Sequence, residues 1–282
     1  NIESGKTYYI AVPTTKLTSG WTISFTTSDS VYTRKSKKDI TFSRNKVINL
    51  GDFKTEGKYW GDKERGIVEE NQEVCMGNFT VEKKTYKVYF AKSNLTATGL
   101  AANETDFGDY FAWASTEPWL TSYTLSGSTI NFNIWKEGKS GGYTVSNAPY
   151  SEGSDYTKYT SQGKTLEIFD DAARQILGGK WQVPTAYILY ELCNQTKFTW
   201  SWSNNGMKIS NGTNSIFLPA AGFIDGKDLS TSINEGGSYW SNMANLTIDA
   251  FYLYLDKTSQ KLSNSDRCYG LPIRPVRLEE VP

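Results

Sequence analysis

Short bursts of alternating apolar and polar residues open the chain, and turn-forming residues separate them. Four such bursts lie between Tyr8 and Leu50, and the segment 18–20 is one of the intervening turns. Alternation with a period of two is typical of antiparallel strands that bury one face. We therefore predict that residues 1–53 form part of a β-sandwich.

The pattern changes at Lys54. The next stretch reads KTEGKYWGDKERGIVEEN, which is charged and glycine-rich and has no apolar periodicity. Such a composition is typical of a solvated linker. We expect a linker over residues 54–72 and a second domain over residues 73–282.

The second domain is predicted to begin with a strand pair and to continue into a long polar region. The strands cover 74–81 and 86–90, with 82–85 as the turn. Residues 120–165 contain few apolar side chains, and long segments of this kind inside a domain are usually functional or disordered. We expect an ordered surface loop region there. Its tyrosines are expected to be exposed, namely Tyr143, Tyr150, Tyr156 and Tyr159.

Two short helices are predicted after this polar region. In the first, apolar residues recur at i, i+3, i+4 and i+7 from Phe169, and glycines at 178–179 end the helix. The second covers 184–194 and begins at a Pro-Thr pair. Its buried face is expected to consist of Ile188, Leu189 and Leu192.

After the helices the pattern returns to strands. A hairpin is predicted at 198–210, because an Asn-Asn-Gly turn separates two alternating segments. A buried run at 214–223, an alternating strand at 250–256 and a closing strand at 269–277 follow, and 224–238 is expected to form a loop. The whole pattern predicts a mainly β fold of the α+β class with two short helices.

Composition and charge narrow the range of partners. The 282 residues include 30 basic and 30 acidic side chains, and no basic run exceeds two residues. This argues against a nucleic-acid partner, because phosphate-binding faces need clustered cations. No stretch has the ~18 consecutive apolar residues of a membrane helix, so no membrane-spanning segment is expected. The abundance of Tyr, Gly, Ser, Thr and Asn is typical of β-rich extracellular proteins.

Catalytic chemistry has little support in the sequence. The chain contains no His, which excludes Ser-His-Asp and Cys-His nucleophiles and His-ligated metal sites. An alternative enzyme hypothesis, glycoside hydrolysis, would place Asp225 and Asp228 opposite Glu235, but we interpret these as turn-capping acids. Three further acids are interpreted as helix-end and surface groups, namely Asp170, Asp171 and Glu191.

Several motifs of the second domain occur together in one known family. They read DDAARQILGGKWQVPT, FTWSWSNNG, NSIFLPAAGF, SYWSN, AFYLYL and RCYGLPIRPVR, in this order, after an earlier motif DYFAWASTEPW. Over roughly residues 79–277 the chain thus resembles the FISUMP family of bacterial surface proteins. The strand pattern of residues 1–53 resembles the closing strands of fimbrillin-like pilins of gut anaerobes, with a generic β-sandwich as the alternative.

The resemblance implies a particular architecture. The FISUMP family in turn resembles the C-type-lectin-like fold shared with formylglycine-generating enzymes, in which a WxxPT helix start and a terminal G-x-x-x-R-x-V strand recur. These motifs correspond to residues 181–185 and 270–276 here. By this resemblance, a C-type-lectin-like domain at 73–282 follows a partial β-sandwich.

Departures from the family pattern limit what it implies about chemistry. Trp240-Ser241-Asn242 resembles the Trp-Asn-Asp segment near the calcium and sugar sites of C-type lectins, but Asn242 replaces the Asp and no sugar-binding triplet is present. The oxidase members need paired cysteines near the C-terminal end, where only Cys268 lies. We therefore expect no cofactor, with calcium unsupported, and no enzyme activity. Cys268 either pairs with Cys193 or is a buried free thiol, and both alternatives stay open.

The expected function is that of a cell-surface or fimbrial adhesin of the tip type, at the outer membrane or outside the cell. Loops rich in Tyr, Trp, Asn and Asp suit a glycan or protein ligand, and other pilin subunits are the expected assembly partners. We expect the ligand-binding residues to line one concave surface. These candidates are Asp225, Asp228, Asn234, Glu235, Trp240, Asn242 and Asp249.

The alternative function is a structural or assembly module of a fimbria that binds no ligand. In such a module the aromatic residues serve the core instead of a binding surface. This alternative predicts that four tryptophans are buried, namely Trp119, Trp200, Trp202 and Trp240.

Overall fold

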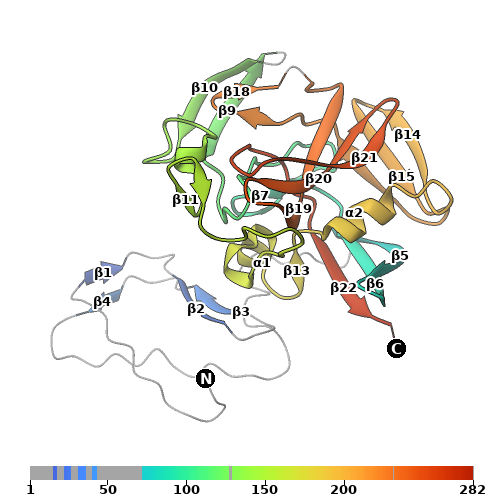
Figure 1. The fold of residues 1–282 in the computed structure, drawn as a ribbon, viewed down its shortest axis with the longest axis horizontal. Coiled ribbons are helices and arrows are strands. Elements are labelled where there is room, and N and C mark those ends of the chain that lie inside the picture. Colours follow the sequence, from blue (N-terminus) through green and yellow to red (C-terminus); the bar gives the residue numbers. More distant parts are fainter. Residues whose placement is uncertain are drawn as a thin grey trace, which may run out of the picture.

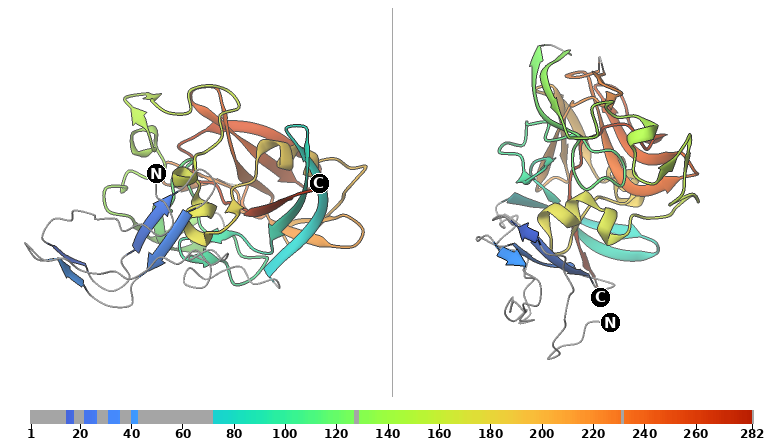
Figure 2. Two further views of the ribbon diagram at one scale, coloured as in Figure 1. Left: turned by 90° about the horizontal axis from the view of Figure 1, so that it is seen from below. Right: turned by 90° about the vertical axis from the view of Figure 1, so that its left-hand side faces the viewer.

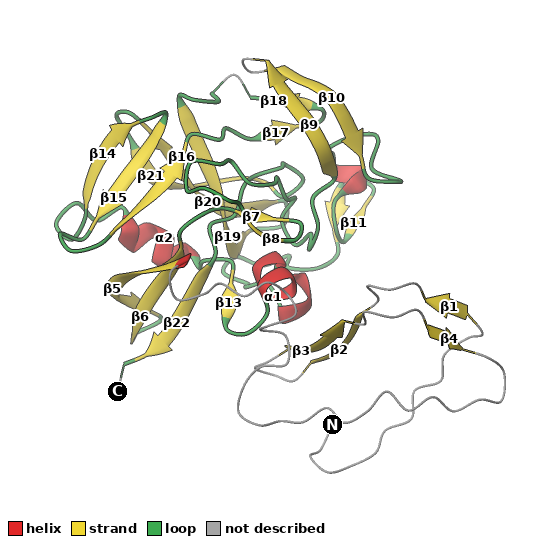
Figure 3. Cartoon of the chain, turned by 180° about the vertical axis from the view of Figure 1, so that it is seen from behind, coloured by secondary structure: helices red, strands yellow, loops and turns green. Residues whose placement is uncertain are grey.

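The described part of the chain is mainly β, as the sequence predicts. The computed structural model describes residues 15–17, 22–26, 31–35, 40–42, 72–126, 129–230 and 232–281. Within them, antiparallel strands form several sheets, and two α-helices accompany these (Figures 1 and 3). The predicted fold class, mainly β with two short helices, is therefore confirmed.

Four short strands are described in the N-terminal region. The strand β1 (Thr15–Leu17) pairs with β4 (Ile40–Phe42), and β2 (Thr22–Thr26) pairs with β3 (Val31–Lys35), both antiparallel. The strands β2 and β4 coincide with two of the four alternating bursts that predict strands there, whereas β1 and β3 lie between bursts. The bursts near Tyr8 and Leu50, the turn at 18–20 and the linker up to residue 71 lie outside the described residues.

A four-stranded antiparallel sheet joins the beginning and the end of the region 72–281. Its strands, in spatial order, are β13 (Trp181–Gln182), β22 (Val276–Glu280), β6 (Lys84–Ala91) and β5 (Glu73–Val81). The last strand β22 therefore lies beside the second strand of the region (Figure 2). The turn between β5 and β6 is shorter than predicted, because it consists of Glu82 and Lys83 alone.

Two three-stranded sheets carry the second half of the domain. One contains β19 (Gly236–Asn245), β20 (Asp249–Asp256) and β21 (Gln260–Asp266), and the other contains β14 (Thr199–Ser203), β15 (Gly206–Ser210) and β16 (Ser215–Pro219). The predicted hairpin at 198–210 is confirmed. Its two turn residues, Asn204 and Asn205, have φ values of 49° and 53°, and positive φ at both positions is the geometry that favours Asn in such turns.

The two helices begin where the capping residues predict. Asp171 caps α1 (Ala172–Leu177) by accepting a hydrogen bond from the Arg174 backbone, and Thr185 caps α2 (Ala186–Leu192) in the same way at Ile188. Gly178, with φ 76°, follows the last residue of α1. The predicted buried face of α2 is confirmed for Ile188, Leu189 and Leu192.

Two details of the helix prediction are wrong. Phe169 lies in a 3-10 turn, η3 (Ile168–Asp170), before α1, and is 59% exposed instead of facing the core. Asp170 and Asp171 are buried instead of lying on the surface, because hydroxyl, ammonium and backbone N–H donors surround their carboxylates. Glu191 lies in the last turn of α2, as a helix-end acid. It accepts a hydrogen bond from the Thr80 backbone and forms an ion pair with Lys197.

The segment 120–165 is not the exposed loop region that its composition suggests. It contains the hairpin β9 (Leu120–Ser126) and β10 (Thr129–Trp135), a 3-10 turn η2 (Val145–Asn147) and the short pair β11 (Ser151–Glu152) and β12 (Asp155–Tyr156). Of the four tyrosines expected to be exposed, Tyr143, Tyr156 and Tyr159 are buried and only Tyr150 is exposed.

A physical reason explains these buried tyrosines. The hydroxyl of Tyr143 donates to the Tyr110 carbonyl, that of Tyr156 donates to Asp266 and that of Tyr159 donates to Asp170. A tyrosine whose hydroxyl has a partner can be buried like a phenylalanine. These tyrosines therefore contribute to the core, although the residues around them in the sequence are polar.

Two further hairpins are very short. The strand β7 (Leu95–Thr96) pairs with β8 (Gly99–Leu100), and β17 (Ile224–Asp225) pairs with β18 (Asp228–Leu229). The second of these, together with the start of β19, occupies the segment 224–238 that the sequence predicts as a loop, so that prediction is wrong. The β17 strand is held in place because Ile224 exchanges backbone hydrogen bonds with Gly270.

Three clusters of buried side chains form the core. The first contains Trp113 and Trp240 beside α1, the second lies between α2 and strands β5, β6, β15 and β20, and the third contains Trp119 and Tyr143. Cys75, Cys193 and Cys268 are free thiols, so of the two alternatives for Cys268 the structure has the buried free thiol. No helix in the described ranges is long and apolar enough to cross a membrane.

Candidate functional site

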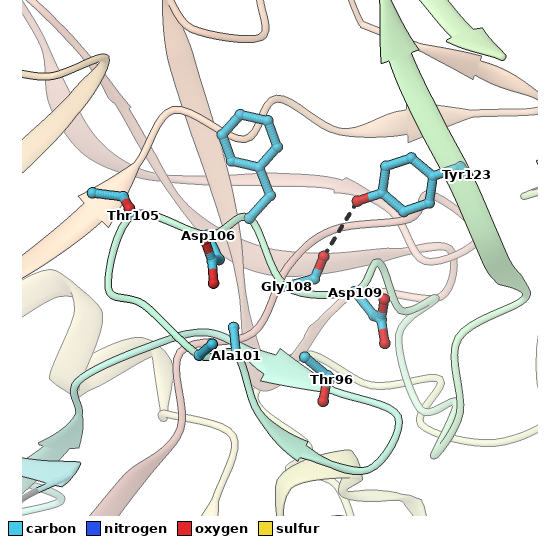
Figure 4. A pocket seen from close by; sticks show the side chains of 9 residues that line it. Thr96, Ala101, Thr105, Asp106, Gly108, Asp109 and Tyr123 are labelled. Carbon is cyan, nitrogen blue, oxygen red and sulfur yellow. Dashed lines mark hydrogen bonds between the residues drawn. The ribbon is translucent and has the colours of Figure 1, made fainter.

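An open cavity of about 510 Å³ lies beside the β7–β8 hairpin and strand β9 (Figure 4). Its volume falls within the range of ordinary small-molecule sites, roughly 300–1,000 Å³. We call it the Asp109 pocket. Its lining residues are Thr96, Ala101, Ala102, Thr105, Asp106, Phe107, Gly108, Asp109 and Tyr123.

Gly108 holds the loop of the pocket against β7. Its φ is +70°, and a Cβ built at this position would lie 2.6 Å from the Leu95 carbonyl oxygen and 2.7 Å from Cβ of Asn94. The neighbouring Asp109 backbone donates a hydrogen bond of 2.9 Å to the same Leu95 carbonyl. Only glycine allows this approach without displacing backbone, so the position of Asp109 follows directly from Gly108.

A buried hydrogen-bond network supports the loop from below. Arg274 is almost fully buried, and it donates to the Asn94 side chain at 2.9 Å and to three backbone carbonyls. The Asn94 amide in turn donates to the Phe107 carbonyl at 2.8 Å. A buried network of this kind, in which the charged group has several acceptors, fixes the surrounding backbone. The pocket is therefore built on a rigid support.

The carboxylate of Asp109 is the most distinctive group of the pocket. Its Oδ2 accepts a hydrogen bond from the Ala97 backbone at 2.7 Å. Within the described residues, Oδ1 accepts none. Burial raises the pKa of Asp109, and the hydrogen bond from Ala97 opposes this effect. A half-buried carboxylate with a free oxygen can accept a strong hydrogen bond from a ligand.

Asp106 and Tyr123 complete the polar lining. Asp106 accepts hydrogen bonds from the backbone and the side chain of Asn103, which closes the loop on itself. Tyr123 donates to the Gly108 carbonyl at 3.4 Å, and burial together with the charge of Asp109 raises its pKa to about 12. Tyr123 therefore keeps its proton near neutral pH. Figure 4 shows the carboxylates of Asp106 and Asp109 projecting to the same side of the loop, toward Ala101 and Thr96.

This arrangement supports the binding of a ligand. The lining consists of carboxylates, hydroxyls and short apolar side chains, and such a set holds a ligand by hydrogen bonds and contact area. Among the residues whose positions are described, no group of three or more Cys, Asp or Glu side chains is arranged to hold a metal ion.

The seven residues predicted from the sequence do not come together in this pocket. Asp225 and Asp228 face each other across the β17–β18 hairpin and are exposed. Asn234 and Glu235 are exposed in the turn before β19, where Asn234 has φ +66°. These four positions therefore lie on the surface, as a binding role requires.

The other three predicted residues belong to the β19–β20 sheet. Trp240 is 1% exposed and donates from its indole nitrogen to the Phe111 carbonyl. Asn242 is also buried. Asp249 pairs with Asp266 across β20 and β21, and burial together with the charge of Asp266 raises its pKa. The expectation that Trp240 and Asn242 line a concave binding surface is wrong, because β19 directs them into the interior.

Two of the predicted acids do share a neighbourhood. Tyr269 is half-buried and stacks on Phe223, with ring centroids 5.6 Å apart. Burial raises the pKa of Tyr269, and the charges of Asp225 and Asp249 contribute in the same direction. These two acids therefore act electrostatically on the same tyrosine.

The residues of the Asp109 pocket carry a weak signal in the sequence. The segment AANETDFGD contains three acids and no Lys or Arg, and it ends at an aromatic block. The aromatic block that follows is part of the core, since Phe111 and Trp113 are buried. The sequence alone assigns no role to Asp106, Gly108 and Asp109, because the contacts that bring them together involve β7 and Arg274.

Comparisons with known proteins give no further guide to this site. No family model, no curated protein and no solved structure matches the chain. The interpretation of the Asp109 pocket therefore depends on its geometry and chemistry.

Proposed function

We propose that the chain is a cell-surface or fimbrial binding protein, an adhesin, whose region 72–281 binds a glycan or protein ligand in the Asp109 pocket. The observation that carries this proposal is the open cavity of about 510 Å³ with the half-free carboxylate of Asp109 in its wall. A concave site with a few placed polar groups is the usual form of a binding site.

The rigidity of the pocket favours binding over a merely structural role. Gly108 fits against Leu95 without room for a side chain, and Arg274 fixes Asn94 from below. A site held in this way needs little ordering when a ligand arrives, so less of the interaction energy is lost. Acidic residues that only keep a loop soluble do not require a loop held in one conformation.

The resemblance to FISUMP surface proteins supports the proposed location at the outer membrane or outside the cell. The resemblance of residues 1–53 to fimbrillin-like pilins supports other pilin subunits as assembly partners. The C-type-lectin-like architecture of 73–282 belongs to the same proposal. The lining of the Asp109 pocket is suited to hydrogen bonding and contact with a ligand, and we propose binding without enzyme activity.

The test compares ligand binding by the wild type and by Asp109→Ala on a glycan array and a panel of matrix proteins. A hydrogen bond to a charged group contributes about 1.5–3 kcal/mol, so the variant is expected to bind about tenfold or more weakly. Asp155→Ala, on the exposed β11–β12 hairpin and outside the pocket lining, is the matched control and is expected to bind as the wild type does. Equal binding by wild type and Asp109→Ala would reject the pocket as the site.

The second candidate function is the structural or assembly module. It is favoured by the burial of Trp119 and Trp240 and by the packing of half-buried Trp200 and Trp202 against the second core cluster. The same experiment separates the two functions. Absence of binding to every glycan and protein, by a folded wild type at high concentration, would support the structural module.

A further inference from the structure

The charge around the Asp109 pocket has a single sign. Glu104, Asp106 and Asp109 lie within six consecutive residues, and no Lys or Arg is among the lining residues. Arg274 lies beneath the pocket, but it is 1% exposed and engaged with Asn94 and three carbonyls. A ligand in the pocket therefore meets negative charge without a compensating cation.

The hydrogen-bonding groups of the pocket are mainly acceptors. Thr96 donates its hydroxyl proton to the Gly99 carbonyl, and Tyr123 donates its own to the Gly108 carbonyl. Their oxygens remain as acceptors, beside the carboxylates of Asp106 and Asp109. The hydroxyl of Thr105, on the exposed rim, can also donate. Since carboxylates and engaged hydroxyls offer lone pairs, a complementary ligand brings mainly donors, as hydroxyl or ammonium groups.

The shape of the pocket favours a saccharide over a peptide. The strands β7 and β8 beside the pocket have two residues each, which is too short an edge for an added peptide strand, and β9 contributes only Tyr123 to the lining. The apolar part of the wall consists of Ala101, Ala102 and the half-buried rings of Phe107 and Tyr123. A pocket with such a wall suits a compact sugar ring, which has hydroxyls on its edge and C–H groups on its face.

We infer that the Asp109 pocket binds a saccharide that is uncharged or carries an ammonium group, and that it rejects sialylated, sulfated and uronate-containing glycans. This inference rests on the proposed function and adds the ligand class to it. An anionic ligand in the pocket would be repelled by the negative charges of Asp106 and Asp109. These two residues therefore discriminate against anionic glycans, in addition to accepting hydrogen bonds from the ligand.

The test uses the full chain on a glycan array with matched series, in which the same backbone is printed in neutral, amine-bearing, sialylated, sulfated and uronate forms. The wild type is expected to bind neutral or amine-bearing members at least about tenfold more tightly than their anionic counterparts. Asp109→Asn keeps the shape and removes one charge, so the preference is expected to shrink severalfold. Asp155→Asn, outside the pocket lining, is expected to leave the preference unchanged.

A second variant tests the charge argument by gain of binding. Thr105 is exposed on the rim, and Thr105→Lys introduces a cation without disturbing buried groups. It is expected to raise binding of uronate and sulfated members severalfold. Thermal unfolding of each variant near the wild-type midpoint shows that the fold is intact.

The outcomes distinguish the inference from the proposed function. Preferred binding of anionic glycans by the wild type overturns the inference and leaves the proposed function standing. Binding of matrix proteins without any glycan, when Asp109→Ala abolishes it, overturns the inference in the same way. Binding that is unaffected by Asp109→Ala overturns both, because the ligand is then held elsewhere.

Discussion

At Gly108 the backbone combines a left-handed conformation with close contact to a neighbouring strand. The φ of +70° would be tolerable for some residues, but the space for a Cβ is already filled by Leu95 and Asn94. Gly138 has a similar φ of +75° and nothing within 4 Å of its would-be Cβ. A comparison of alanine substitutions at these two glycines therefore separates the cost of a left-handed backbone from the cost of crowding by neighbouring atoms.

We predict that Gly108→Ala lowers the free energy of unfolding more than Gly138→Ala. Left-handed backbone costs an alanine about 1–2 kcal/mol at either position, and overlap with backbone atoms adds about 1–3 kcal/mol at Gly108 alone. Urea unfolding followed by tryptophan fluorescence measures both. Equal losses for the two variants would show that the loop moves freely away from β7.

The contrast between Asp109 and Trp240 shows how far the sequence predicts the candidate site. Trp240 stands in a motif resembling a ligand-binding segment, yet β19 places it in the core against Phe111. Asp109 has no motif, and its role depends on contacts with Leu95 and Ala97 and on the distant Arg274. The residues that line the candidate pocket depend on contacts that no sequence spacing displays.

At the scale of elements, Asp171 joins α1 to β13. Its carboxylate accepts the capping hydrogen bond from the Arg174 backbone, and both of its oxygens accept from the Val183 backbone, just beyond β13. Burial raises the pKa of Asp171 from 3.8 to about 6, although these hydrogen bonds oppose the effect. The folded chain therefore retains a proton at this carboxyl over a pH range in which the unfolded chain has lost it.

We predict that this carboxyl makes the wild type less stable as the pH rises from about 4 to about 6. In that window the folded state binds more protons than the unfolded state, so the free energy of unfolding falls with pH, by on the order of 2–3 kcal/mol in total. Asp171→Asn does not titrate and is expected to lack this component. Urea unfolding at a series of pH values measures it, and parallel profiles for the two proteins would contradict the assignment.

Elements that depend on local signals were predictable, and those that depend on distant partners were not. The hairpin around Asn204 and the helix capped by Thr185 follow from turn and capping residues within a few positions. The burial of Tyr156 instead depends on Asp266, 110 residues away. The composition of residues 120–165 gives no information about Asp266. For this reason it predicts a surface loop where the structure has buried side chains.

At the scale of the whole molecule, Arg277 ties the last strand to the first strand of the region. It donates two hydrogen bonds to the carboxylate of Glu73, which is 204 positions earlier, and its guanidinium lies 4.1 Å from the ring centroid of Tyr89. A planar fork that pairs with a carboxylate in this way cannot be reproduced by an ammonium group. The contact therefore closes the sheet through geometry as well as charge.

We predict that Arg277→Lys lowers the thermal midpoint by about 2–4 °C, which corresponds to about 1 kcal/mol in a domain of this size. The control is Lys84→Ala, which removes the exposed pair with Glu280 on the same sheet. That pair is solvated, so the control is expected to leave the midpoint nearly unchanged. Calorimetry measures both, and similar shifts would show that Arg277 acts only as a surface charge.

The order of strands in this sheet also determines how the domain responds to force. Both β5 and β22 run antiparallel to β6, so they are parallel to each other, and residues 72 and 281 lie at opposite ends of the strands. A pull between these two points therefore acts along the strands and loads their hydrogen bonds in shear, all at once, instead of opening them one by one. Because forced unfolding is governed by the rate of this step, the sheet that closes the fold is also the part that resists a pull applied between these two points.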